Sequence, residues 1–285
     1  MDPFELAFEL HRAASSGNVE NVKALLRVPG IRVNLRDKNG DTPLSLAAYR
    51  GHDKIVKMLV RSESIDVNQT TLGGVTPLLA AVTSGQDKVV VLLLEVEGVR
   101  VNQAEVKGAT PLIMAAMKGH YKVTEQLLKD ECINVNQAMV NGVTPLIMAT
   151  QRGRYKIVDL LLRANGIEVN KEDEHGVTPL HIACFNGEEE VVKLLIRKEG
   201  IEVNRATSNQ GVTPLLMAAA KGHYRVVKLL LGRGEIQVIQ ASFNGVTPLA
   251  IAAHYRHGKI VELFLRRAEI REIGWTGWRP IASPA

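Results

Sequence analysis

The chain has 285 residues, of which 46% are hydrophobic, 23% charged and 4% aromatic, and its formal net charge is +5. The hydrophobic fraction excludes a disordered chain, 24 glycines exclude a collagen, and two cysteines exclude a disulfide-stabilised scaffold. Wholly apolar runs such as 89–94 span only six residues, whereas a membrane span needs about 20, and the acidic N-terminus is untypical of a secretory signal. We therefore expect a soluble, cytoplasmic protein with reduced cysteines.

The dominant feature of the sequence is a repeat of 34 residues. The pair Thr-Pro occurs seven times, and successive threonines are separated by 34 residues, or by 35 in one case. Glycine stands two residues before each of these threonines and nine residues after the first six. The threonines are Thr42, Thr76, Thr110, Thr144, Thr178, Thr213 and Thr247. Such a period predicts stacked structural repeats rather than independent globular domains.

Each repeat predicts two short helices. Threonine can accept a backbone N–H bond as the N-cap and proline fits the first helical position, so a helix is expected to begin at each Thr-Pro. The glycine nine residues later can adopt the left-handed conformation that ends this helix. A second apolar stripe follows, for example Ile157, Val158 and Leu161, with the spacing of one helical face. A pair such as Val67-Asn68 then leads through polar residues to a hairpin-like turn.

Neither helix can bury its apolar stripe alone, because helices of about ten residues are marginal in water. The units must therefore stack into a common core. The sequence predicts a mainly α fold, a solenoid of stacked helix-turn-helix units joined by β-hairpin-like finger loops.

The repeated residues resemble the ankyrin repeat. Its pattern Gly-x-Thr-Pro-Leu-His-x-Ala-Ala, followed by Gly-His, Val-Val-x-Leu-Leu-Leu and Val-Asn, is matched by stretches such as 176–183 and 115–120. The tetratricopeptide repeat has the same period, but its proline ends a helix, whereas proline begins one here. The resemblance implies an ankyrin-type solenoid of eight repeats. They comprise an N-terminal capping repeat in residues 1–34 and seven repeats of 34–35 residues in 35–270, followed by a tail in 271–285.

Both ends of the repeat array depart from the pattern. In the capping repeat, Glu9 stands where proline is expected. In the last repeat, Arg256 replaces the turn glycine and Ile239 replaces the loop asparagine. The tail contains Trp275 and Trp278. Two interpretations of the tail remain open: it folds back over the last helix pair, or the array formerly continued into further repeats.

No motif in the sequence points to catalysis. A P-loop, a nucleophile elbow, a His-Glu-x-x-His pair and a clustered-cysteine pattern are absent from it. His52, His120 and His223 follow turn glycines in different repeats, which places them about 10 Å or more apart, so we expect them to stabilise turns rather than bind a metal. The acidic segment 172–175 is expected to be a solvated finger tip, and Cys132 an exposed thiol without a neighbouring base. We therefore expect no enzyme activity, no catalytic residues, no cofactor and no metal site.

The positions that vary while the scaffold repeats predict the functional surface. The ankyrin resemblance implies a concave face, made of finger loops and the exposed side of the first helices, that binds protein partners. By register, this face contains the two residues before each turn glycine and the residues at the finger tips. Tyr, Phe, Met and Arg, which are enriched at protein interfaces, are frequent there. The candidate partner-binding residues are Tyr49, Arg50, Leu72, Lys107, Met117, Lys118, Asn141, Gln151, Arg152, His175, Phe185, Asn186, Lys221, Phe243, His254 and Tyr255.

The sequence therefore predicts a protein-interaction scaffold. Its partner is expected to be a protein or peptide, acidic and partly apolar, bound in the concave groove, with no small-molecule substrate and no membrane span. The cations expected to orient the partner are Arg50, Lys118, Arg152 and Lys221, and the side chains expected to supply buried area are Tyr49, Met117, Phe185 and Tyr255.

Two alternatives stay open. One is nucleic-acid or anionic-surface binding through the basic face, which the lack of any basic run disfavours. The other is that the chain is the targeting part of an effector whose activity lies elsewhere. The sequence leaves the partner's identity and the oligomeric state open.

Overall fold

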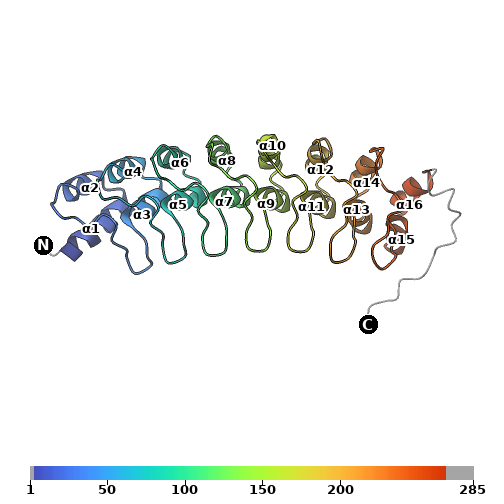
Figure 1. The fold of residues 1–285 in the computed structure, drawn as a ribbon, viewed down its shortest axis with the longest axis horizontal. Coiled ribbons are helices and arrows are strands. Elements are labelled where there is room, and N and C mark those ends of the chain that lie inside the picture. Colours follow the sequence, from blue (N-terminus) through green and yellow to red (C-terminus); the bar gives the residue numbers. More distant parts are fainter. Residues whose placement is uncertain (1–2, 268–285) are drawn as a thin grey trace. The chain divides into compact units, whose positions relative to one another are not determined.

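A computed structural model describes residues 3–267, within which sixteen helices and no β-strands are assigned (Figure 1). The chain divides into two compact units, Met1–Val140 and Asn141–Ala285, and each is described by itself. None of the helices in this described range is long and apolar enough to cross a membrane. The predicted tail, 271–285, lies outside the described residues, and so do residues 268–270 of the predicted last repeat.

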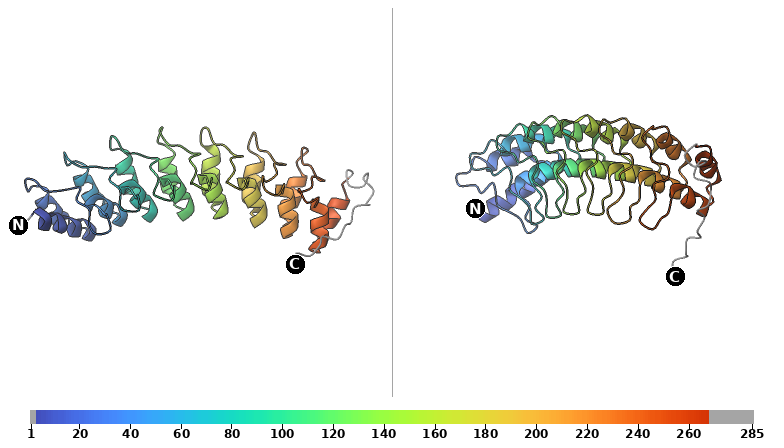
Figure 2. Two further views of the ribbon diagram at one scale, coloured as in Figure 1. Left: turned by 60° about the horizontal axis from the view of Figure 1, so that its bottom comes forward. Right: turned by 45° about the vertical axis from the view of Figure 1, so that its right-hand side comes forward.

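The helices of the first unit are α1 (Pro3–Ser16), α2 (Val19–Leu25), α3 (Pro43–Arg50), α4 (Asp53–Leu59), α5 (Pro77–Ser84), α6 (Asp87–Leu94), α7 (Pro111–Lys118) and α8 (Tyr121–Leu127). They form successive pairs arranged in two rows (Figures 1 and 2). The first helices of neighbouring pairs, α1, α3, α5 and α7, pack against one another, and so do the second helices α2, α4, α6 and α8. Each first helix also packs against the second helix of its own pair.

The helices of the second unit are α9 (Pro145–Gln151), α10 (Tyr155–Arg163), α11 (Pro179–Asn186), α12 (Glu189–Ile196), α13 (Pro214–Lys221), α14 (Tyr224–Leu231), α15 (Pro248–His254) and α16 (Gly258–Leu265). This unit has the same arrangement: α9, α11, α13 and α15 form the row of first helices, and α10, α12, α14 and α16 form the row of second helices. The predicted mainly α, ankyrin-type arrangement is therefore confirmed in each unit.

The Thr-Pro pairs begin the first helices as predicted. In all seven, the threonine side chain accepts the backbone N–H of the third helical residue. At Thr144, Oγ1 lies 3.1 Å from the backbone nitrogen of Ile147. The turn glycines after the first helices are left-handed, with φ of 78° at Gly51 and 77° at Gly222.

The apolar stripes of both helices form the core of each unit. Leu44, Val56 and Leu59 in the first unit and Val158 and Leu230 in the second are 0% exposed. Burial of one such side chain contributes roughly 1.5–3 kcal/mol. Because helices this short are marginal alone, packing between pairs stabilises them more than helix propensity does.

The loops before the first helices are hairpin-like, and we call them fingers. Before α5, the Thr71 N–H donates to the Val75 carbonyl at 3.0 Å, and the Gly74 N–H donates to the Thr71 carbonyl at 3.0 Å. Gly74 is left-handed, and a Cβ added there would lie 3.1 Å from the backbone nitrogen of Val106 in the next finger. Glycine is required at this position by both the conformation and the close approach. Fingers with this pattern span 37–41, 71–75 and 105–109 in the first unit and 173–177, 207–212 and 242–246 in the second.

Asparagines in the loops after the second helices join consecutive pairs. Asn68 Nδ2 donates to the Gly98 carbonyl at 2.7 Å, and its Oδ1 accepts the Arg100 N–H at 2.8 Å. The same two bonds recur at Asn34 and Asn102 in the first unit and at Asn170 and Asn204 in the second. The sequence predicted the loop at these asparagines but not the bonds, because their partners are backbone groups.

The histidines after the turn glycines form a second joint. His223 lies over Gly187 of the preceding pair, and its Nε2 is 2.9 Å from the carbonyl oxygen of Phe185. The corresponding bonds of His52, His120 and His257 reach the carbonyls of Ser15, Thr83 and Ala220 at 3.1, 3.3 and 3.1 Å. None of the four side chains caps its own helix. They therefore hold one pair to the preceding pair, which extends the predicted turn-stabilising role.

The two unusual ends of the array differ structurally from the inner pairs. Where Glu9 replaces proline, no Thr-Pro begins the helix, and α1 extends back to Pro3 to reach 14 residues. At the other end, Arg256 has a φ of 59°, and among residues 3–267 it is the one non-glycine residue with positive φ. A side chain in the left-handed conformation costs about 1 kcal/mol relative to glycine.

Replacing Arg256 with glycine is expected to stabilise the second unit by about 1 kcal/mol, because it removes this backbone penalty. Gly222→Arg, at the equivalent turn one pair earlier, is the control, and its change in stability should have the opposite sign. A Cβ there would lie 2.6 Å from the ring of His257, so this variant should be destabilised. Urea unfolding of the two variants measures both changes. A destabilised Arg256→Gly variant would contradict the left-handed assignment.

His181 gives the second unit a pH-dependent contact. The side chain is 0% exposed, and burial lowers its pKa from 6.5 to about 4. Its Nδ1 accepts the Thr178 N–H at 3.2 Å, and its Nε2 lies 3.0 Å from the carbonyl oxygen of Val212 in the next finger. A neutral ring protonated at Nε2 satisfies both contacts.

We expect the stability that His181 contributes to be complete above pH 6.5 and to be lost as the pH falls toward 4. The unfolded chain binds this proton near pH 6.5 and the folded chain only near 4, so the loss reaches at most about 3 kcal/mol. His181→Ser is the matched control, because Ser45 forms the same capping box with Thr42 without titrating. Urea unfolding between pH 7 and 4 should show a steeper loss in the parent protein. Equal slopes would contradict this account.

Candidate functional site

The predicted partner-binding residues lie at the ends of first helices and at finger tips. Fifteen of the sixteen are exposed, and Met117 is half-buried. No predicted residue is enclosed in the core of its unit. Each unit has its own candidate surface. Val140 is the last residue of the first unit, and Asn141, which follows it in the sequence, is the first residue of the second unit.

In the first unit, the last turns of α3 and α7 present Tyr49 with Arg50 and Met117 with Lys118. Tyr49 is 49% exposed. Between them, the last turn of α5 contributes Thr83 and Ser84. Their hydroxyls donate to carbonyl oxygens of the same helix, and Thr83 Oγ1 lies 2.7 Å from the carbonyl oxygen of Leu79. Their hydrogen-bonding capacity is thus used locally, and the larger side chains of the neighbouring helices dominate the surface.

The finger tips of the first unit are more apolar than the predicted residues suggest. Leu72, Val106 and Val140 are 73%, 74% and 89% exposed. The Val106 N–H donates to the Gly73 carbonyl at 3.1 Å, which fixes one tip against the preceding one. Lys107 is exposed beside them. Val106 and Val140 are not among the predicted residues, because a single exposed apolar residue is common; their succession along neighbouring fingers is the informative signal.

In the second unit, the last turns of the first helices combine aromatic and cationic side chains. Lys221 Nζ of α13 lies 4.3 Å from the centroid of the Phe185 ring of α11, a cation–π contact. His254 and Tyr255 form an edge-to-face pair with ring centroids 4.9 Å apart. Asn186 is exposed beside Phe185. The last turn of α9 contributes Gln151 and Arg152, both exposed.

The finger tips of the second unit are polar except for one. Phe243 is 70% exposed, and its N–H donates to the Gln210 carbonyl of the preceding finger at 3.0 Å. His175 Nε2 lies 3.6 Å from the Glu174 carboxylate. Asn141 Oδ1 accepts the Val143 N–H at 3.3 Å, so this predicted contact residue also shapes its own turn.

The two units differ in charge. Residues 1–140 contain 16 Lys and Arg and 16 Asp and Glu, whereas residues 141–285 contain 19 and 14. The net charge of +5 therefore arises in the second unit. None of the last two residues of any first helix from α3 to α15 is acidic. The candidate surfaces consequently offer cations without adjacent carboxylates at these helix ends.

The acidic segment 172–175 is organised by local bonds. Asp173 Oδ1 accepts the N–H groups of His175 and Val177, each at 2.9 Å. Glu172 forms an ion pair with Arg205 at 2.9 Å. In the part of the chain that the structure describes, no group of three or more His, Cys, Asp and Glu is placed to hold a metal ion.

The two thiols differ in environment. Cys184 is 0% exposed, and burial raises the pKa of its thiol, which disfavours the reactive thiolate. Cys132 is exposed, as predicted, and its carbonyl accepts a hydrogen bond from Asn102.

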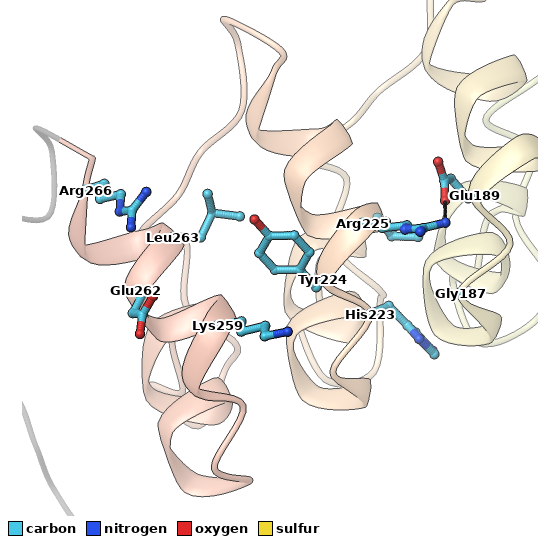
Figure 3. A pocket seen from close by; sticks show the side chains of 10 residues that line it. Gly187, Glu189, His223, Tyr224, Arg225, Lys259, Glu262, Leu263 and Arg266 are labelled. Atoms are coloured by element: carbon cyan, nitrogen blue, oxygen red, sulfur yellow. Dashed lines mark ion pairs between the residues drawn. The ribbon is translucent and has the colours of Figure 1, made fainter.

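A pocket of about 720 Å³ lies on the second helices of the second unit (Figure 3). Tyr224 and Arg225 of α14, Lys259 and Glu262 of α16, and Glu189 of α12 contribute to its lining. Arg225 Nη1 and Glu189 Oε2 are 3.5 Å apart. None of the predicted partner-binding residues lines this pocket, so it is separate from the candidate surface.

The repeat pattern has counterparts among known families. A model of consecutive ankyrin repeats matches residues 10–105, 91–173 and 166–240, and a model of a single ankyrin repeat matches residues 244–274. These matches cover most of the chain and include every helix of both first-helix rows from α3 onward. No curated protein matches the chain.

The contact between Lys221 and Phe185 can be tested in solution. We expect the ε-methylene protons of Lys221 to be shifted upfield by the ring and to return to ordinary values in Phe185→Leu, which keeps an apolar side chain without the ring current. Stability should change by no more than about 1 kcal/mol, since the pair is exposed. Phe243→Leu is the control and should leave the Lys221 shifts unchanged. An unshifted Lys221 in the parent protein would contradict the contact.

Proposed function

The chain belongs to the ankyrin repeat family, whose repeats generally mediate protein–protein interactions, and we propose that it binds an acidic, partly apolar protein or peptide through the ends of its first helices and its finger tips. The observation that carries this proposal is that exposed aromatic or cationic side chains recur at the ends of α3, α7, α9, α11, α13 and α15, together with exposed apolar residues at four finger tips, Leu72, Val106, Val140 and Phe243.

The composition of these surfaces favours a macromolecular partner. Tyr, Trp and Arg dominate the binding energy of many interfaces, because they bury large areas or make forked hydrogen bonds. Tyr49 is followed by Arg50, and Phe185 lies against Lys221. These pairs offer apolar area and positive charge together, which suits a segment in which acidic and apolar residues alternate.

The backbone beneath these side chains is fixed before any partner binds. The carbonyl oxygens of Phe185 and Ala220 each form a hydrogen bond with the histidine of the next pair. The Tyr49 carbonyl oxygen accepts a hydrogen bond from the side-chain amide of Gln86 at 3.4 Å. A preformed backbone lowers the ordering cost of association. The proposed mechanism is therefore docking onto a rigid surface, and the groove implied by the ankyrin family is its proposed location.

Ankyrin repeat proteins are typically non-enzymatic scaffolds. We extend this to the present chain: it acts by binding, without catalysis, and does so in the cytoplasm. The side chains that a catalyst could use have local roles instead. Asp173 holds a finger, His181 joins two pairs, and Cys184 is buried as a thiol.

Binding of nucleic acid is the second candidate, favoured by the excess of cations in the second unit. The two candidates differ in their salt dependence. Affinity for DNA or RNA falls steeply with ionic strength, since each neutralised phosphate releases counterions. A peptide that buries apolar side chains on Tyr49 or Phe185 should depend on salt less.

We expect a random-peptide display library selected on the full chain to enrich peptides that combine Asp or Glu with apolar residues. Reversing the charge of Arg50, Lys118, Arg152 and Lys221 together should weaken the enriched peptides at least about tenfold, or 1.4 kcal/mol, measured by calorimetry. The melting temperature should change little, because these side chains are exposed.

The control variant reverses four exposed cations in the first turns of second helices: Lys88, Lys122, Lys156 and Lys259. It has the same change in net charge but leaves the proposed surface intact, so affinity should fall much less. Equal losses of peptide affinity in the two variants would show that the effect comes from net charge alone, and this would overturn the proposed surface. Enrichment of basic peptides, or tighter binding of a single-stranded DNA with a steep salt slope, would overturn the acidic partner.

A further inference from the structure

The side of the last helix pair that faces away from α13 and α14 lacks the turn joint that links earlier pairs. Gly187 and Gly222 lie beneath the histidine of the next pair, whose ring would be 2.6 Å from an added Cβ. Arg256 occupies this position after α15, and its side chain is exposed. Because Arg256 is also left-handed, its Cβ occupies the position that comes too close to such a histidine ring at Gly187 and Gly222. A regular repeat cannot dock here through that joint.

The asparagine joint is also missing at this repeat. Asn170 and Asn204 each bind two backbone groups of the following loop. Ile239, at the same position, has no polar atom in its side chain and is 50% exposed. Two independent replacements in one repeat therefore remove both joints. Whatever covers this side differs from a further repeat of the same kind.

The same side is nevertheless apolar. Val192 and Val227 are 0% exposed on α12 and α14, which are followed by another pair, whereas Val261 of α16 is only half-buried. Leu231 is 7% exposed, and its counterpart Leu265 is 43% exposed. We define the end face by its residues Ile239, Ala253, Val261 and Leu265. An apolar face of this kind, contiguous with the core, favours a covering segment.

We propose that the C-terminal segment of this chain, residues 268–285, covers the end face with Trp275 and Trp278. The segment follows directly after the pair that carries the face, and 18 residues can extend about 60 Å, which exceeds the width of a helix pair. Its tryptophans are the only two in the chain, and each can bury about 150–250 Å². This inference is independent of the proposed function, since the end face contains none of the candidate partner-binding residues.

Charge favours this segment over a second copy of the chain. Arg256 and Lys259 are exposed next to the end face. In a two-fold contact between copies, the same surface meets itself, which brings these cations toward one another. The C-terminal segment contains two acidic residues, Glu269 and Glu272, and two basic ones, Arg271 and Arg279, so its side chains bring no net positive charge toward these cations.

Intrinsic fluorescence tests the proposal, because both tryptophans lie in the segment. In the folded 285-residue chain we expect tryptophan emission at shorter wavelength than in the urea-unfolded chain, and acrylamide quenching several-fold weaker. Both should be independent of protein concentration. Val261→Ser should raise the quenching toward that of the unfolded chain. Phe243→Ser, which changes an exposed apolar residue on the finger of the same repeat, should leave it unchanged.

Three results would overturn the proposal. Emission and quenching equal to those of the unfolded chain would show an uncovered end face. Protection that appears only at concentrations where gel filtration detects a dimer would assign the face to a second copy. Protection unaffected by Val261→Ser would place the tryptophans elsewhere. Amide hydrogen exchange of α15 and α16 checks that the Val261→Ser variant remains folded. If these helices unfold in that variant, Val261→Thr, which preserves the shape of the side chain, is used in its place.

Discussion

The contact between consecutive helix pairs is the interaction on which each unit depends. From α2 onward no helix exceeds nine residues, so none of these helices is expected to be stable alone. Apolar stripes supply most of the stabilisation, while two polar joints fix the register. A histidine such as His223 bonds to a carbonyl 38 residues earlier, and an asparagine such as Asn68 binds two backbone groups of the following loop. Both joints satisfy backbone groups that the short helices and loops leave unpaired.

The joints also connect the scaffold to its proposed function. The carbonyls that accept the histidine and glutamine bonds belong to the last turns of first helices, at residues such as Tyr49 and Phe185. The backbone of the candidate surface is therefore restrained, while the side chains above it stay exposed. Variation at these positions changes the surface without changing the register. This separation explains how a strictly periodic scaffold can present a first unit with apolar finger tips and a second unit with cations and aromatic rings.

The sequence predicts most of the fold because its main determinants are local. Thr-Pro sets where a helix begins and glycine sets where it ends, and both recur with the period of the chain. The sequence does not predict that α1 extends back to Pro3, because the first repeat lacks the Thr-Pro pair that marks where the other first helices begin. The partners of His223 and Asn68 are also missed, since a backbone carbonyl has no sequence signature. Exposure of the candidate residues follows from register, with half-buried Met117 as the exception, but the chemistry of a partner is inferred only from composition.

The proposed binding surface consists of the ends of the first helices and the fingers. Amide hydrogen exchange of the chain, with and without a saturating acidic peptide enriched by selection on it, tests this location most directly. The account predicts slower exchange in fingers 71–75, 105–109 and 242–246 and at the C-terminal turns of the first helices, with the second helices unchanged. Protection confined to α12, α14 and α16, around the pocket of Figure 3, would contradict it.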